Sequence, residues 1–186
     1  MRGADTAKRL NQCMRNGWAP VPWGHHPPQV RAAIRAARFR PLIKQCFSNS
    51  QKLLLNQHPL TVQFEYVEGI VSIHGIPIQH AWLNMPASAA PRIDITLPNL
   101  PEILHSYTVP IEEVQVHIAR SQSHGPVRAN RLTMLQHATW WRLDAVTASG
   151  MTDDQLQQFI QTQQQVLGAL SRLAIGERIP GSEPTP

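Results

Sequence analysis

The sequence predicts one α+β domain in which a cysteine-bearing helix packs on a small antiparallel sheet, with further helices at both ends. The chain has 186 residues, of which 42% are hydrophobic and 16% charged, enough for one folded core. Alternating apolar residues indicate short strands in its middle third. Apolar residues at helical spacing mark the segments before and after these strands.

Composition divides the chain into an arm, a domain and a tail. We expect a basic, partly ordered arm over residues 1–26 and a disordered tail over residues 177–186, because Gly and Pro punctuate both. Residues 27–176 form the single α+β domain. Within it, a central core over residues 41–120 precedes a helical part over residues 127–176.

Two helices are expected before the strands. The first begins at a proline pair that ends in Pro28, because proline is tolerated in the first turn of a helix. It ends before Pro41, since the residue preceding a proline avoids the helical region. The second helix runs from Leu42 or Cys46 to Asn56.

The middle of the chain predicts the sheet. Alternation of apolar and polar residues predicts a half-buried strand at Thr61–Val67, followed by strands at Val71–Ile76 and Ile78–Asn84. Gly69 indicates a bulge or a close backbone approach. A last strand at Arg92–Leu97 is expected to pair with Ile78–Asn84 as an antiparallel hairpin.

Beyond the sheet the sequence predicts an irregular segment and then helices. Residues 98–110 are expected to be irregular because they contain several prolines. A helix over residues 110–121 has acidic residues in its first turn, which suits the helix dipole. A further helix is expected over residues 130–138.

The clearest helix begins after Thr152, which is a favourable N-cap residue. One face of this helix consists almost entirely of glutamine, which occupies seven of the eleven positions 155–165. An uncharged polar face suits packing against a partner or a second copy of the chain. Two interpretations of this face therefore stay open: a homo-oligomer formed through residues 152–175, or plain exposure to solvent.

Charge is distributed unevenly along the chain. Residues 1–52 contain ten Lys and Arg but one acidic residue, although the net charge of the whole chain is only +5. The first interpretation of this basic third is a solvated helix face with a loose tail, and contact with an acidic protein or a nucleic acid is the alternative. No zinc-finger spacing, RNA-binding aromatic motif or phosphate-binding glycine loop supports a dedicated nucleic-acid module.

The chain contains two cysteines, Cys13 and Cys46. Its N-terminus has no apolar run after its charges, and no stretch approaches the ~20 apolar residues that a membrane-spanning helix needs. We therefore expect a cytoplasmic protein with reduced thiols and no membrane contact.

A cysteine, a histidine and an aspartate occur in an order that suits nucleophilic acyl chemistry. Cys46 lies where a helix is predicted to start, and the partial positive charge there favours its thiolate. His80 and Asp94 lie on predicted neighbouring strands, as base and orienting carboxylate. Backbone amides at the helix start are candidates to bind the oxyanion, with side-chain donors from Gln45 or Asn49.

Five short blocks resemble a known protein family. The order of Cys, His-Ala-Trp and Asp resembles the transglutaminase-like branch of the papain-like superfamily. The full succession, over about residues 40–120, resembles a group of small uncharacterised bacterial and phage proteins. The blocks are Cys46-Phe-Ser-Asn, Tyr66-Val-Glu-Gly69, His80-Ala-Trp82, Asp94-Ile-Thr96 and Tyr107-Thr-Val-Pro110.

The resemblance implies a papain-like or transglutaminase-like core in which the cysteine, histidine and aspartate are nucleophile, base and orienting acid. Trp82 would shield His80 from water, and Tyr66 and Glu68 would bind substrate. The chain departs from the blocks at Thr108, where these proteins carry glycine, and after the aspartate, where proline is frequent. An inactive descendant that only binds therefore stays open.

Three functions are compatible with these residues. The leading one is a cysteine-dependent amide or acyl hydrolase or acyltransferase of peptidase, deamidase or transglutaminase type, which acts on a protein, peptide or amide through an acyl-enzyme without a cofactor. The alternative is a non-catalytic binding or inhibitor protein that uses the basic third or the Gln-rich helix. A metal hydrolase using His74, His80 and Asp94 lacks a compact ligand spacing.

Overall fold

The computed structural model describes residues 23–26, 28–42, 44–56, 64–86, 92–97 and 101–174. The expectations for most of the basic arm, for Cys13 and for the C-terminal tail lie outside these residues.

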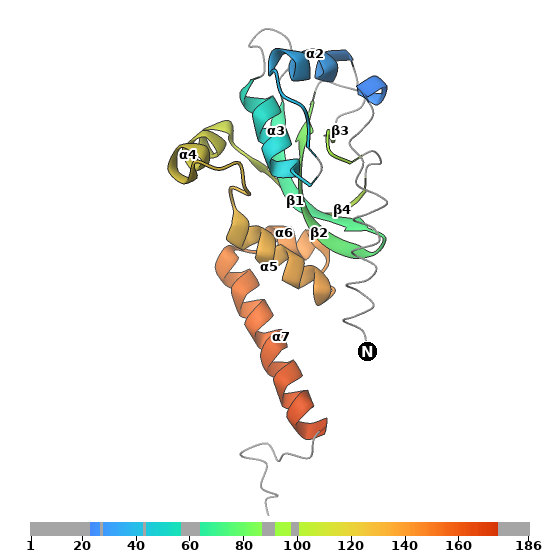
Figure 1. The fold of residues 1–186 in the computed structure, drawn as a ribbon. Helices are drawn as coiled ribbons and strands as arrows, with labels where there is room; N and C mark the ends of the chain where they lie inside the picture. The colour runs from blue at the N-terminus through green and yellow to red at the C-terminus, as the bar shows by residue number, and fades with distance from the viewer. Residues whose placement is uncertain are drawn as a thin grey trace, which may run out of the picture.

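The described residues form a mixed α/β structure, which confirms the α+β class (Figure 1). Four antiparallel strands make one sheet in the order β3-β2-β1-β4, and six α-helices surround it. In chain order the elements are η1 (Trp23–His25), α2 (Pro28–Ala36), α3 (Cys46–Leu55), β1 (Glu65–Ile73), β2 (Ile76–Asn84), β3 (Arg92–Ile93), β4 (Glu102–Val109), α4 (Ile111–Ser121), α5 (Ala129–Trp140), α6 (Ala145–Gly150) and α7 (Asp153–Ala174).

Strand β1 lies at the centre of the sheet and pairs with both β2 and β4. The sequence predicted two strands here, at Thr61–Val67 and Val71–Ile76, but the structure has one strand over Glu65–Ile73. Gly69 does not interrupt it, because the residue keeps its place opposite His80 in the ladder. Residues 61–63 lie outside the described part of the chain.

Gly69 is required by a close approach of the backbone. A Cβ atom at this position would stand 2.2 Å from the carbonyl oxygen of His105 and 2.8 Å from the Cη2 atom of Trp82. The register between β1 and β4 also shifts next to it, between Ile70 and Val71. Both features agree with the predicted bulge or close approach.

The structure corrects the prediction that residues 98–110 are irregular. Residues 102–109 form β4, an edge strand that pairs with β1. Pro101 and Pro110 stand just outside this strand, so neither removes a hydrogen bond from the ladder. Prolines that flank a strand therefore produce the same sequence signal as prolines within a loop.

The predicted strand at Arg92–Leu97 is shorter than expected. Its antiparallel pairing with β2 is confirmed, but β3 contains only Arg92 and Ile93. The Asp94 carboxylate ends it, because Oδ1 accepts the backbone N–H groups of Thr96 at 2.9 Å and Leu97 at 3.0 Å. Such local side-chain bonds compete with the sheet ladder.

Helices α3 and α5 pack on β1 and β2. One apolar cluster joins α2, α3 and the sheet, and a second joins α5, α6 and the start of α7 to the sheet. The predicted helix over residues 130–138 is confirmed as α5, whereas α6 was not predicted. Asp144 caps α6 by accepting the N–H of Thr147 at 2.9 Å.

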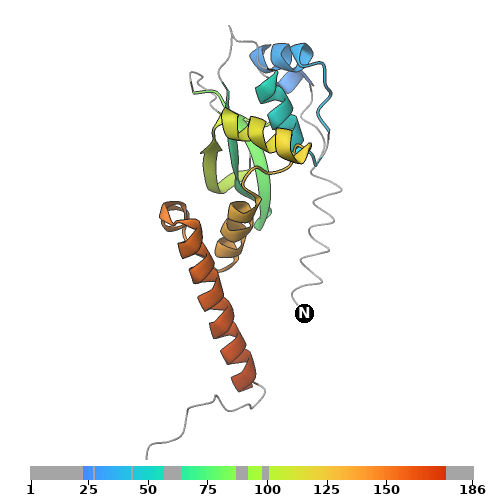
Figure 2. The same cartoon turned by 90° about the vertical axis from the view of Figure 1, so that its left-hand side faces the viewer.

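Helix α7 begins after Thr152, the predicted N-cap residue, which forms a capping box with Gln155. The Thr152 hydroxyl accepts the N–H of Gln155 at 3.3 Å, and the Gln155 side chain accepts the N–H of Thr152 at 2.8 Å. The first half of α7 packs on α5, and the second half leaves the body of the protein (Figures 1 and 2). None of the described helices has the length and apolar character needed to cross a bilayer.

Replacing Gly69 by alanine is expected to destabilise the fold by at least ~2 kcal/mol, because the new Cβ atom meets backbone that cannot rotate away. Urea unfolding measures this. Gly168→Ala in α7 is the matched control: a Cβ there meets no atom within 4 Å. It should leave the free energy of unfolding unchanged or raise it by up to ~1 kcal/mol. Equal effects of the two changes would contradict the close approach.

Candidate active site

Cys46 is the first residue of α3 and is only 5% exposed. The first hydrogen bond within the helix runs from the N–H of Asn49 to the carbonyl of Gln45, at 2.7 Å. The preceding N–H groups, those of Cys46, Phe47 and Ser48, therefore have no acceptor in the helix. The Gln45 side chain, which is exposed, makes no capping bond to them. The thiol thus lies beside backbone N–H groups for which the helix supplies no acceptor.

Asn49 does not serve as the predicted oxyanion donor. Its Nδ2 group already donates to the carbonyl of Leu42 at 2.8 Å and to the hydroxyl of Thr96 at 3.1 Å. Its Oδ1 accepts the N–H of Leu42 at 3.1 Å. Both amide hydrogens are therefore occupied, and this buried side chain ties the start of α3 to the loop after β3.

The next two residues of α3 fix the helix against the sheet. The Ser50 hydroxyl donates to the carbonyl of Ala81 in β2, at 3.3 Å. The Gln51 Nε2 group donates to the Tyr66 hydroxyl at 3.0 Å and to the carbonyl of Gly125 at 2.7 Å. These bonds set both the rotation and the axial position of α3, and with them the position of its first residue.

His80 lies in β2 and is bound to Asp94. The distance between His80 Nε2 and Asp94 Oδ2 is 2.5 Å, and both side chains are almost fully buried. Trp82 follows on the same face of the strand, with its ring centroid 6.1 Å from that of His80 and a 24° angle between the planes. Trp82 is itself buried, in keeping with the predicted shielding of His80.

Electrostatics keep this pair charged. Burial lowers the pKa of His80. The charge of Asp94 and the hydrogen bond to it raise this pKa by more than burial lowers it, and Cys46 raises it further. The resulting pKa of His80 is about 9. Burial raises the pKa of Asp94, yet the His80 charge and the two backbone N–H groups hold it below its usual value. The imidazole is therefore protonated at neutral pH.

The thiol completes the set, because the Cys46 side chain lies close enough to the His80 ring to raise its pKa. Nε2 of His80 is occupied by Asp94, so Nδ1 is the ring nitrogen left for the thiol. The structure thus brings Cys46, His80 and Asp94 together in one chain of contacts, although they come from a helix, a strand and a loop. An imidazole beside a thiol is the pair that cysteine-dependent acyl chemistry uses.

Arg92 is part of this site, although its role was not predicted. Its guanidinium lies 4.7 Å from the centroid of the Trp82 ring, and Nη2 lies 3.9 Å from Asp94 Oδ2. Nη1 donates to the carbonyl of Pro101 at 2.7 Å, which holds the side chain in place. The sequence signal that could have revealed this role is strand alternation, because residues two apart, such as Arg92 and Asp94, lie on the same face of a strand. Arg92 supplies a second positive charge beside the carboxylate.

Tyr66 and Glu68, predicted to bind substrate, are both buried. The Glu68 carboxylate accepts four hydrogen bonds, from the hydroxyls of Tyr66 and Tyr107 and the N–H groups of Val127 and Arg128. Burial, and after it the Glu68 charge, raises the pKa of both tyrosines, which stay neutral donors. This network joins residues 127–128 to the sheet, and the substrate-binding role of Tyr66 and Glu68 stays a prediction.

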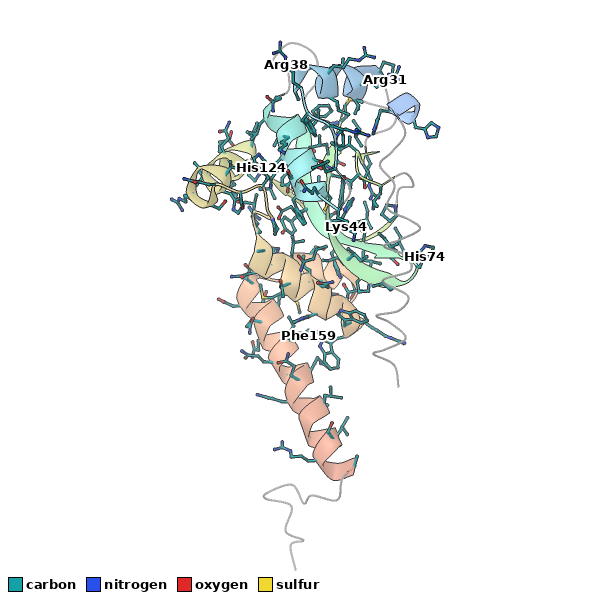
Figure 3. All side chains as sticks on the ribbon, in the orientation of Figure 1. Arg31, Arg38, Lys44, His74, His124 and Phe159 are labelled. Atoms are coloured by element: carbon teal, nitrogen blue, oxygen red, sulfur yellow. The ribbon has the colours of Figure 1, made fainter. Side chains whose placement is uncertain are left out.

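Other features of the described residues do not add to the site. A surface hollow of about 420 Å³ beside α4, lined by residues that include Glu113, His117 and Val127, contains no member of the Cys–His–Asp set. No group of three or more His, Cys, Asp or Glu side chains that could hold a metal ion occurs in the described ranges. His74, considered above as a metal ligand, is exposed in the turn between β1 and β2 (Figure 3).

Comparison with protein-family models, with curated proteins and with solved structures found no match to this chain. Its own fold and site therefore define its class. It is an α+β protein with a nearly buried set of Cys, His and Asp side chains, of which the cysteine begins a helix.

The raised pKa of His80 predicts a pH-dependent contribution to stability. A histidine with a pKa of about 6.5 when unfolded and about 9 when folded stabilises the fold fully below pH ~6.5. This stability is lost as the pH rises through 9. The charge of Asp94 is the main reason why the pKa of His80 is raised, and Asp94→Asn removes this charge. The substitution should therefore destabilise the protein more at pH 6 than at pH 10, as measured by urea unfolding. NMR titration should show a lower His80 pKa in this variant.

Asp153→Asn is the control, because Asp153 pairs at the surface with Arg131, which stays charged at both pH values. Its effect on the free energy of unfolding should be the same at pH 6 and pH 10. If Asp94→Asn behaved in the same way, His80 would not gain its proton affinity from Asp94.

Proposed function

We propose that the protein is a cysteine-dependent amide or acyl hydrolase or acyltransferase built on a papain-like or transglutaminase-like core. The observation that carries the proposal is the contact of Cys46, at the start of α3, with a His80 ring whose Nε2 lies 2.5 Å from Asp94. A nucleophile, a base and a residue that orients the base are the minimum for acyl transfer through a covalent intermediate.

The reaction runs in two halves. The Cys46 thiolate attacks the carbonyl carbon of an amide, so a C–S bond forms while the carbonyl electrons move to oxygen. When the oxyanion collapses, the C–N bond breaks and His80 gives its Nδ1 proton to the leaving nitrogen. Water or an amine then attacks the acyl-enzyme, His80 takes up a proton from it, and the thiolate leaves.

The oxyanion would be held by backbone amides at the start of α3. The N–H groups of Cys46 and its neighbour Phe47 precede the first hydrogen bond of the helix, and the helix dipole adds partial positive charge there. Gln45 is exposed beside them, so its side-chain amide is the remaining candidate for an additional donor.

The substrate we propose is a protein or peptide with acidic groups near the reacting amide. Residues 23–56 contain six Lys and Arg and no Asp or Glu. Lys44, labelled in Figure 3, is exposed two residues before Cys46. A surface of one sign raises the local concentration of oppositely charged ligands. A thiol nucleophile also suits a reducing compartment such as the cytoplasm.

Burial supports a second candidate, a non-catalytic binding or inhibitor protein on the same fold. Cys46, His80 and Asp94 are 5%, 1% and 6% exposed, so a substrate reaches the thiol only if neighbouring residues move. A buried free cysteine is often a small apolar side chain with no chemical role. The two candidates differ in the reactivity of the thiol.

Alkylation of Cys46 by iodoacetamide tests the proposed enzyme. With Cys13 replaced by serine, the reaction should persist at pH 6, where an ordinary thiol is almost fully protonated. His80→Ala should reduce the rate at pH 6 by at least about tenfold, because the thiolate loses its cationic partner. The rate constants follow from mass spectrometry of the labelled peptide.

His117→Ala is the matched control, since His117 lies on the surface helix α4, where its Nε2 lies 3.4 Å from the Ser121 hydroxyl, and it is not a member of the Cys–His–Asp set. It should alkylate like the parent protein. A Cys46 thiol that does not react at pH 6, or that reacts equally without His80, would contradict the enzyme and favour the binding protein.

The ratio of alkylation rates with iodoacetate and iodoacetamide tests the expected preference for acidic groups. Iodoacetate is anionic, so this ratio at Cys46 should exceed that of a free thiol and fall with added salt. Lys44→Gln should lower it about two- to fivefold. Lys52→Gln removes the same charge near the other end of α3 and should leave the ratio unchanged. Equal effects would refute local steering by Lys44.

A further inference from the structure

The outer half of α7 presents an apolar face that no described residue covers. Leu156 and Ile160, in the first half, are buried in the body of the protein. Val166, Leu167 and Leu170 lie further along and are 50%, 51% and 57% exposed. Figures 1 and 2 show this part of the helix standing clear of the sheet and the other helices.

The exposed residues continue the seam that begins inside the protein. Leu156, Ile160, Gln163, Leu167 and Leu170 follow one another at intervals of four and three residues. This is the spacing of the core positions of a coiled coil, which keeps one face turned toward a neighbouring helix. Helix α5 is that neighbour for the first two residues. From Gln163 onward, no helix of the described structure packs against the seam. We call this part of the seam the outer seam.

A helix that projects in this way is marginal by itself. Residues 161–174 would extend about 21 Å at 1.5 Å per residue. Isolated helices of this length are barely stable in water, and Gly168 costs roughly 1 kcal/mol relative to alanine. A packing partner would therefore stabilise the outer half of α7.

The chemistry of the helix identifies that partner as a second copy of the chain. No charged residue occurs between Asp154 and Arg172, so the outer seam has no charge to attract or orient an oppositely charged partner. Pairing with itself meets no like-charge repulsion for the same reason. The exposed side chains of the outer seam are mainly aliphatic (Val166, Leu167 and Leu170), and an aliphatic face is complementary to an identical one across a two-fold axis.

We propose that two copies associate through their outer seams as an antiparallel helix pair. A parallel pair in register would bring the two α5 helices together, because α5 covers the seam at Leu156 and Ile160. An antiparallel pair sets Leu167 of one copy opposite Leu170 of the other, and Gln163 opposite Ala174. The two bodies then lie at opposite ends of the pair and do not collide.

The contact is short, so the association is weak and reversible. Two helices that pair over fewer than four turns bury less than the ~1,200 Å² of a standard stable interface. The full chain should therefore be a monomer at low micromolar concentration and a dimer toward ~1 mM.

Sedimentation equilibrium over this concentration range tests the proposal. The mass of the full chain should rise from 20.9 kDa toward twice that value. The double change Leu167→Glu with Leu170→Glu should abolish the rise, because it places two carboxylates on each copy in the seam. Gln161→Glu with Gln165→Glu is the control, since it adds the same charge on the opposite face and should still associate.

A constant mass for the unaltered chain would overturn the proposal, as would equal association of both double variants or equal loss in both. Urea unfolding checks that the leucine variant keeps its folded body, because both leucines lie outside the core. If that variant unfolds, the pair Leu167→Ala and Leu170→Ala replaces it. That pair should weaken association at least about tenfold, and unchanged association would overturn the proposal.

Cross-linking tests the orientation in chains with Cys13→Ser and Cys46→Ser. A chain carrying Gln163→Cys should form a disulfide with a chain carrying Ala174→Cys, because the antiparallel pair sets these positions opposite each other. Cross-links between two Gln163→Cys chains at the same rate would refute the antiparallel arrangement. Neither result depends on the reactivity of the candidate active site.

Discussion

The position of α3 on the sheet is the constraint on which the rest of the structure depends. Three consecutive polar residues, Asn49, Ser50 and Gln51, bond to the loop after β3, to β2 and to β1, and all three are buried. A buried donor without an acceptor costs about 1–3 kcal/mol, so the helix cannot slide or rotate without losing several such bonds at once. Cys46, one turn earlier, is thereby held at His80.

Charge burial is the second constraint. Removing His80 and Asp94 from water is costly, and the attraction between them offsets that cost only if the remaining polar atoms are satisfied. Thr96 and Leu97 supply N–H groups to the other carboxylate oxygen, and Arg92 adds a positive charge nearby. The stacked Trp82 ring fills the space beside the imidazole. This arrangement maintains a protonated imidazole next to the thiol at neutral pH.

The two proposals concern different parts of the molecule. The Cys–His–Asp set lies where α3 meets the sheet, whereas the outer seam lies on the half of α7 that projects away from it (Figure 1). Pairing through α7 would leave the approach to Cys46 from Lys44 and Gln45 free. It would also place two such sites on one assembly, which raises the effective concentration of a second site for a substrate with two reactive groups.

The sequence by itself determined the local elements and the candidate residues. Apolar spacing and capping located α5 and α7, alternation predicted the pairing of β2 with β3, and the order of chemical groups singled out Cys46, His80 and Asp94. Only the tertiary structure decided which polar side chains are occupied. The partners of Asn49 and Glu68 include residues tens of positions away, and local periodicity carries no information about such distant hydrogen bonds. The edge strand β4 and the burial of the site were decided in the same way, by packing that neighbouring residues do not encode.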